Sequence, residues 1–180
     1  MVELEFQQKT KALIDSLKSI CANYGLGNDG NEFKIITQTF LYKFLNDKFA
    51  YEAKKIDESI AKADKWEQAL TALSEDDLEM LQLQMGADTA RLKPTHFINY
   101  LFSQQNAPDF AKLFDDTLID IAISNNEVFA VKTDGGAKVV LFDRLSNYIA
   151  DDSKRDNFCR AIINKLVEFS FDRIFTQKFD

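Results

Sequence analysis

The longest pattern of apolar residues in this chain lies between Asn31 and Phe49. Apolar side chains recur there at steps of three and four residues, at Phe33, Ile36, Phe40 and Phe44. That spacing predicts an amphipathic helix. Further apolar residues widen the stripe around most of the helix, and a helix of this kind is usually packed on more than one side. We therefore expect a central helix, which continues in a more polar form to about residue 59.

The same periodicity predicts helices on both sides of the central one. They are expected at residues 3–24, 61–73, 74–85, 93–102, 108–124 and 156–170. The glycine-rich stretch 25–30 predicts a turn between the first helix and the central one, because glycine adopts the positive φ values that end a helix. Ser74, followed by three acidic residues, predicts an N-cap, and Gly86 predicts the end of that helix. Phe102 is expected to face inward.

One stretch differs from the rest in amino-acid composition. Residues 127–133 and 137–142 are rich in valine and phenylalanine, and Asp134-Gly135 lies between them. An Asp-Gly pair between two such runs is a strong signal for a β-hairpin. The sequence therefore predicts a mainly α domain over residues 1–180, with one β-hairpin at about residues 127–142 that lies against helices.

Two short sequence segments resemble a known family. These are Glu32-Phe33-Lys34 and, shortly after, Phe40-Leu41-Tyr42-Lys43-Phe44-Leu45-Asn46-Asp47. They resemble the start of the modification (M) subunit of type I restriction-modification systems. That family carries an acidic residue, an aromatic residue and a lysine near its N-terminus, and then an apolar run that ends in a Leu-Lys-Tyr-Ile-Ser-Asp-like string. The likeness covers about 20 residues and the overall helical layout.

The resemblance implies a function for a longer protein. The family methylates adenine N6 in DNA with S-adenosylmethionine, on a base flipped out of the duplex. Two modification subunits join one specificity subunit, a restriction subunit can be added, and the complex holds double-stranded DNA. The family's catalytic Asn/Asp-Pro-Pro-Tyr/Phe motif is absent, since the only prolines are Pro94 and Pro108. The chain is thus expected to be an N-terminal helical domain, inert by itself, with a catalytic domain after residue 180.

Composition and charge limit the alternatives. The chain has 16 phenylalanines, which predicts a core packed with phenylalanine, and a net charge of −7, which is unusual for a protein that binds nucleic acid by itself. We interpret the charge as dispersed along the chain, which disfavours an acidic DNA mimic. No apolar run is long enough to cross a membrane. Cys21 and Cys159 are not spaced as a CxxC pair, so buried free thiols in a reducing cytoplasm are expected, although a disulfide between them stays open.

Lysines along the central helix and its extension are the candidate contact residues. They are Lys43, Lys48, Lys54, Lys55, Lys62 and Lys65. Tyr42, Tyr51 and Trp66 are interleaved with them, and such a face can bind DNA phosphates without reading sequence. Neighbouring carboxylates allow another interpretation, a solvated helix surface with balanced charge.

Other motifs are weaker. The stretch 25–30 matches G-x-G-x-x-G, but a dinucleotide fingerprint needs a strand before it, and here a helix is predicted. A DNA phosphate at the N-terminus of the central helix remains a second interpretation of that loop. His96 has no Cys or His neighbour, so a solvent-facing or structural role is expected rather than a metal site. Adjacent carboxylates such as Asp115-Asp116 are interpreted as caps or solvated faces.

The competing hypothesis is a complete, non-enzymatic helical domain that binds other proteins and has no link to methylation. The final run, Phe171 to Phe179, is apolar and lacks a helix stop signal. That favours the first hypothesis, because the family's chain continues into the methyltransferase domain.

Overall fold

The computed structural model describes residues 2–126, 131–132, 138–139, 141–171 and 175. These residues are mainly helical, as the sequence predicts. The longer helices are α1 (Val2–Asn23), α2 (Gly30–Ile56), α5 (Glu75–Met85), α7 (Phe110–Ser124) and α9 (Arg155–Val167). The shorter helices are α3 (Glu58–Lys62), α4 (Trp66–Thr71) and α6 (Ile98–Ser103), with 3-10 turns η1 (Pro94–His96), η2 (Leu145–Tyr148) and η3 (Asp152–Lys154). None of the described helices is long and apolar enough to cross a membrane.

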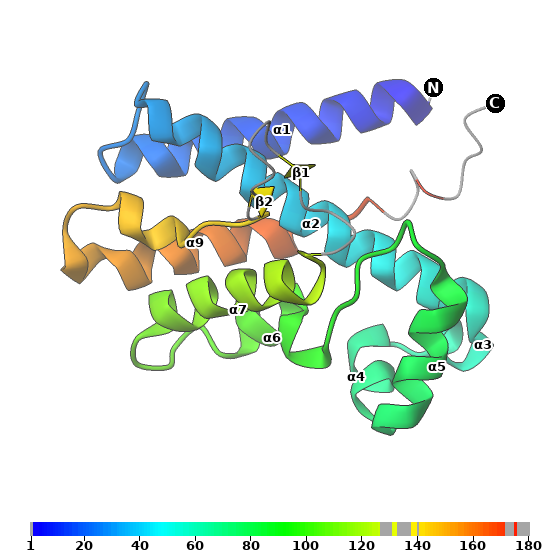
Figure 1. Cartoon of the computed structure of the whole chain (residues 1–180). Helices are drawn as coiled ribbons and strands as arrows, with labels where there is room; N and C mark the ends of the chain where they lie inside the picture. The colour runs from blue at the N-terminus through cyan, green and yellow to red at the C-terminus, as the bar shows by residue number, and fades with distance from the viewer. Residues whose placement is uncertain (1, 127–130, 133–137, 140, 172–174, 176–180) are drawn as a thin grey trace.

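Helix α2 is the longest element and runs through the molecule (Figure 1). It contacts α1 along its first half, and α3 and α5 gather around its C-terminal end. Helix α9 contacts α1, α6 and α7. This arrangement explains why the predicted stripe on α2 is so wide, because elements pack on it from several sides.

The turn before α2 forms as predicted. Gly25 has φ +83°, and the N–H of Leu26 donates to the carbonyl of Cys21 at 2.8 Å, which closes the end of α1. The side chain of Asp29 then accepts from the N–H of Asn31 at 2.8 Å and caps α2. The stretch 25–30 is therefore a helix-to-helix turn.

Phenylalanine dominates the core. Among the described residues, the bulkiest fully buried side chains are Tyr42, Phe49, Phe97, Phe110, Phe114, Phe142, Phe158 and Phe171. Buried side chains from α1, α2, α5, α6, α7 and α9 join them in one hydrophobic cluster. Cys21 and Cys159 are buried free thiols, as expected.

Several predicted details are wrong. The expected helix 61–73 is interrupted, because Ala63 and Lys65 have extended backbone angles, and only α4 forms there. Helix α9 ends at Val167 rather than at residue 170. Phe102 was expected to face inward, but it is 39% exposed on α6.

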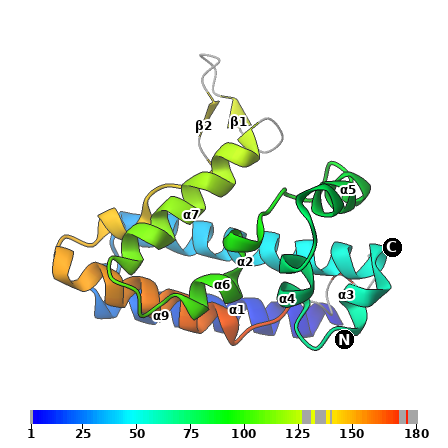
Figure 2. The same ribbon diagram turned by 90° about the horizontal axis from the view of Figure 1, so that it is seen from below.

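The predicted hairpin lies largely outside the described residues. What the structure describes of it is β1 (Val131–Lys132) and β2 (Lys138–Val139), which pair antiparallel with Val131 opposite Val139. Figure 2 shows these two strands standing off the helical body beyond the end of α7.

Candidate interaction groove

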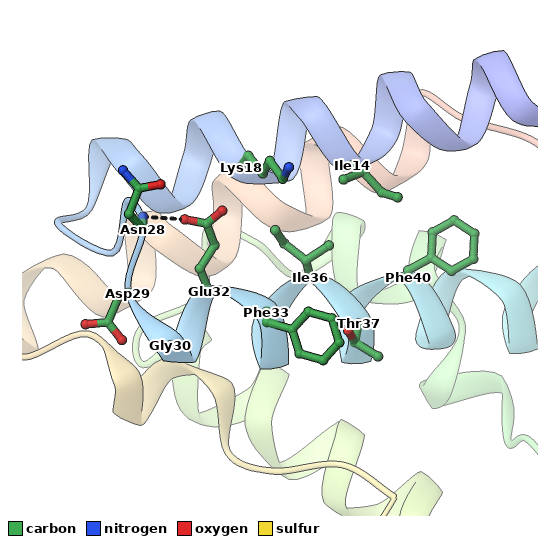
Figure 3. Close-up of a pocket in the computed structure, with 10 residues that line it drawn as sticks. All are labelled: Ile14, Lys18, Asn28, Asp29, Gly30, Glu32, Phe33, Ile36, Thr37 and Phe40. Carbon is green, nitrogen blue, oxygen red and sulfur yellow. Dashed lines mark hydrogen bonds between the residues drawn. The ribbon is translucent and has the colours of Figure 1, made fainter.

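A groove lies between α1 and the first turns of α2. Its volume is about 600 Å³, and it is mostly apolar. Figure 3 shows its lining residues: Ile14 and Lys18 from α1, Asn28 and Asp29 from the turn, and Gly30, Glu32, Phe33, Ile36, Thr37 and Phe40 from α2. Asn28, Asp29 and Glu32 lie at the end next to the turn, whereas Lys18 and Thr37 lie further along, so polar groups border an apolar floor.

Phe33 is the most unusual residue of this groove. Its side chain is 75% exposed, whereas the sequence pattern placed it in the buried stripe of the central helix. Figure 3 shows Phe33 on the same side of α2 as Thr37, turned away from the core. The signal that could have revealed this is the polar or small character of positions 29, 30 and 37, one turn away on either side. An exposed phenylalanine beside an apolar groove is typical of a protein-binding surface.

The N-terminus of α2 already holds two carboxylates. Asp29 caps the helix, and a carboxylate oxygen of Glu32 accepts from the N–H of Asn28 at 2.8 Å (Figure 3). Both groups are negative and lie where a phosphate of DNA or of a nucleotide would have to bind. This geometry disfavours phosphate binding at the turn, and the helix before it removes the dinucleotide interpretation of the glycines.

The six candidate lysines do not form a uniform positive face. Lys43 is only 5% exposed and pairs inside the protein with Asp47, so as placed it is inaccessible to a DNA phosphate. Lys55 and Lys62 are exposed but pair with Glu52 and Glu58 respectively. Lys48 and Lys54 are partly exposed and Lys65 is exposed. These pairs agree with the interpretation of a solvated surface with balanced charge.

The pair of Lys43 and Asp47 is the centre of a buried polar cluster. The Lys43 ammonium lies 3.2 Å from Oδ1 of Asp47, which also accepts from the side-chain amide of Asn46. Oδ2 of Asp47 accepts from the N–H of Phe171 at 3.0 Å, and Oδ1 of Asn46 accepts from the N–H of Ile98 at 2.9 Å. The cluster therefore joins α2 to the start of α6 and to the segment after α9.

His96 is buried and has a structural role. Its Nδ1 accepts from the N–H of Lys93 at 3.0 Å, so its Nε2 carries the proton and lies 2.5 Å from Oδ2 of Asp120. The hydroxyl of Tyr42 donates to the carbonyl of His96 at 2.6 Å. Of the two roles left open by the sequence, the solvent-facing one is wrong. Both ring nitrogens are occupied, which leaves none to activate a nucleophile.

Burial lowers the pKa of His96, and the hydrogen bond that its Nε2–H donates to Asp120 opposes this only in part. Because the imidazole binds a proton less readily in the folded chain than in the unfolded one, whose pKa is about 6.5, we expect the free energy of unfolding to fall as the pH drops below about 6.5. His96→Asn, whose amide oxygen can accept from Lys93, should remove that slope. Urea titrations between pH 5 and 7.5 measure it.

The difference in pH dependence between the wild type and His96→Asn reports on His96 alone, because it is the only histidine in the chain. Burial raises the pKa of Asp47 and of Asp115, and these carboxyls act in the opposite direction, lowering stability as the pH rises above their unfolded value of 3.8. They are present in both proteins and cancel in the difference. Equal pH slopes for the wild type and His96→Asn would contradict the prediction.

The acidic pairs have structural roles. Asp151 caps η3, and Ser74 caps α5 by accepting from the N–H of Asp77 at 3.1 Å. Asp115, expected on a solvated face, is instead buried and accepts hydrogen bonds from the N–H and hydroxyl of Ser146. Within the described ranges, no three His, Cys, Asp or Glu side chains gather as a metal site would require.

Comparison with family models, with curated proteins and with solved structures finds no match to this chain.

Proposed function

We propose that this chain is the N-terminal helical domain of a type I modification subunit. In this role it serves subunit assembly and DNA engagement for S-adenosylmethionine-dependent methylation of adenine N6. The partners of the whole protein are then a specificity subunit, a second modification subunit, a restriction subunit and double-stranded DNA. The catalytic domain follows residue 180.

The observation that carries this proposal is the structural role of the string that resembles the family. Its polar members Tyr42, Lys43, Asn46 and Asp47 are all buried in α2. Tyr42, Asn46 and Asp47 make the hydrogen bonds that fix α2 to η1, to α6 and to the segment after α9, and Lys43 pairs with Asp47 within α2. Buried polar residues that hold helices together depend on the fold. The resemblance of this segment to modification subunits therefore supports a shared helical domain.

The groove supports the assembly role. Glu32 holds the turn, Phe33 is exposed beside the groove, and the ammonium of Lys34 lies 5.9 Å from the ring centre of Tyr148. An apolar groove with an exposed aromatic residue at its edge suits a side chain or helix of another subunit better than it suits DNA.

DNA engagement by this domain depends on the other subunits. Between residues 43 and 65 the six lysines are matched by five carboxylates. A surface with so little net charge releases few counterions from DNA, so strong binding requires the other subunits.

The described residues do not fit S-adenosylmethionine. The cofactor's usual site needs a glycine-rich turn between a strand and a helix, and the glycine-rich turn here joins two helices. The cofactor therefore belongs to the rest of the proposed enzyme.

The proposal predicts that Phe33→Ala weakens binding to the specificity subunit of the same system. Loss of an exposed aromatic anchor from an interface typically costs about 2 kcal/mol or more, or roughly thirtyfold in Kd. Calorimetric titration of the two purified proteins measures the change. Leu4→Ala, which removes another exposed apolar side chain on α1, serves as the matched control and should bind as the wild type does. Wild-type affinity in Phe33→Ala would remove the groove from the assembly surface.

The alternative, a separate interaction domain without a link to methylation, also accounts for the groove. The two are distinguished by the coding sequence after the Asp180 codon. A glycine-rich strand and turn followed by Asn-Pro-Pro-Tyr/Phe would support the modification subunit, and a stop codon would contradict it. Binding to duplex DNA across a salt series, with and without the specificity subunit, then separates direct phosphate contacts from assembly.

A further inference from the structure

The acidic excess of this chain is concentrated in one segment. Residues 1–65 contain ten basic and ten acidic side chains, and residues 91–180 contain twelve basic and thirteen acidic ones. Residues 66–90 contain six acidic side chains and no lysine or arginine. The interpretation of dispersed charge is therefore wrong, because this segment holds nearly all of the net charge of −7.

The structure places most of these carboxylates on one exposed element. Glu75, Asp76, Asp77 and Glu79 lie on α5 and are exposed, and Asp88 follows it. In the part of the chain that the structure describes, none of these five forms an ion pair. Unpaired carboxylates on one short helix leave a local negative field.

Two large apolar side chains are exposed among these carboxylates. Met80 is 58% exposed and Leu83 is 61% exposed, and their spacing of three residues puts them on the same face of α5. Asp76 and Glu79 precede them by one turn. Figure 2 shows α5 at the edge of the molecule, and the exposure of both side chains shows that this face of the helix is open to solvent.

Hollows adjoin both side chains. Met80 and Gln84 line one of about 420 Å³, and Leu83 lines another of about 470 Å³ together with Thr89. The Thr89 hydroxyl is buried and has no hydrogen-bond partner among the residues that the structure describes.

We propose that the acidic face of α5, formed by Asp76, Glu79, Met80 and Leu83, binds a basic amphipathic helix of a partner protein. The apolar side of that helix covers Met80 and Leu83, and its lysines or arginines lie beside the carboxylates. Helix α5 has 11 residues and is therefore about 16 Å long, which matches three turns of a partner helix.

The negative charge of α5 favours a basic helix over duplex DNA and over a second copy of this chain. Duplex DNA carries the same sign of charge as α5 and is repelled. A second copy of this chain is disfavoured, because its sequence outside residues 66–90 is close to neutral. The inference rests on charge and exposure and is independent of the proposed function, so either can fail without the other.

The test uses the full chain and a labelled model peptide. The probe is a fluorescein-labelled helix of about five turns with leucines along one face and lysines elsewhere, followed by fluorescence anisotropy. A peptide of the same composition in an order that is not amphipathic, and one with glutamates in place of lysines, are the peptide controls. We expect only the basic amphipathic peptide to bind tightly, and its affinity to fall steeply with salt.

Variants then locate the binding. Met80→Ser combined with Leu83→Ser should weaken the peptide at least about tenfold, because both apolar contacts are lost. Asp76→Asn combined with Glu79→Gln should flatten the salt dependence. Both pairs are exposed, and circular dichroism checks that they fold. Glu3→Gln combined with Asp15→Asn on α1 makes the same change in net charge and should leave affinity unchanged.

Four results would overturn the inference. These are equal binding of the two basic peptides, unchanged affinity in the Met80/Leu83 variant, binding of duplex DNA that this variant abolishes, and a dimer in sedimentation equilibrium that the same variant dissociates. The third and fourth would assign the face to DNA or to a second copy of this chain.

Discussion

Replacing Asp47 by alanine is expected to lower the free energy of unfolding by about 3–5 kcal/mol, because a buried lysine loses its only described ion-pair partner. The same change removes the acceptor for the N–H of Phe171, which then lies buried without a hydrogen bond. Urea unfolding followed by circular dichroism measures the loss. The segment after α9 should become accessible to protease first, since Asp47 ties it to α2.

Two variants show whether the cause is the unpaired charge. Lys43→Met combined with Asp47→Asn removes both charges and keeps an oxygen for the N–H of Phe171, so its loss should be much smaller than that of Asp47→Ala. Glu52→Ala also breaks a lysine–carboxylate pair on α2, but Lys55 there is exposed, and the expected cost is about 0.5 kcal/mol or less. A double variant as unstable as Asp47→Ala would mean that packing, rather than charge, sets the cost.

Phe158→Ala is expected to lower the free energy of unfolding by about 3–5 kcal/mol through the cavity it leaves. The Phe158 side chain is fully buried on α9, and its ring lies edge-to-face against Tyr24 with the ring centres 5.4 Å apart. Because α9 contacts α1, α6 and α7, the surrounding side chains cannot move into the cavity without separating helices. Chemical denaturation with the same probe gives the value.

Phe33→Ala provides the matched control, since it deletes the same ring from a site that is 75% exposed. Its expected effect on stability is within about 0.5 kcal/mol. The same variant is used in the stability and the binding measurements. The proposed function predicts that it loses binding to the specificity subunit while it keeps the fold. A large loss of stability in Phe33→Ala would show that the ring is packed and would remove it from the interaction surface.

The helices and their ends were largely predictable from the sequence because their signals are local. Periodic apolar residues predicted α1, α2, α5 and α7, and Ser74 caps α5 as the sequence predicts. Capping depends on residues within one turn, so no distant contact is needed to decide it.

The candidate sites were less predictable. The sequence pattern placed Phe33 in the buried stripe and Lys43 among the contact residues, and the structure places them the other way round. The spacing of Lys43 and Asp47 by four residues allowed an ion pair, but on a solvated surface that pair would be unremarkable. It is buried because Ile98 and Phe171, far along the chain, bring backbone N–H groups to the same place.

The sequence by itself therefore determined a mainly helical, phenylalanine-rich protein organised around the helix that begins near Asn31. Only the tertiary structure decided which side chains of that helix meet solvent. Periodicity shows that residues share a face, whereas burial depends on whether another element covers that face. For α2 those elements come from both ends of the chain, so the groove beside Phe33 and the cluster at Asp47 appear only once α1, α6 and the segment after α9 have packed against it.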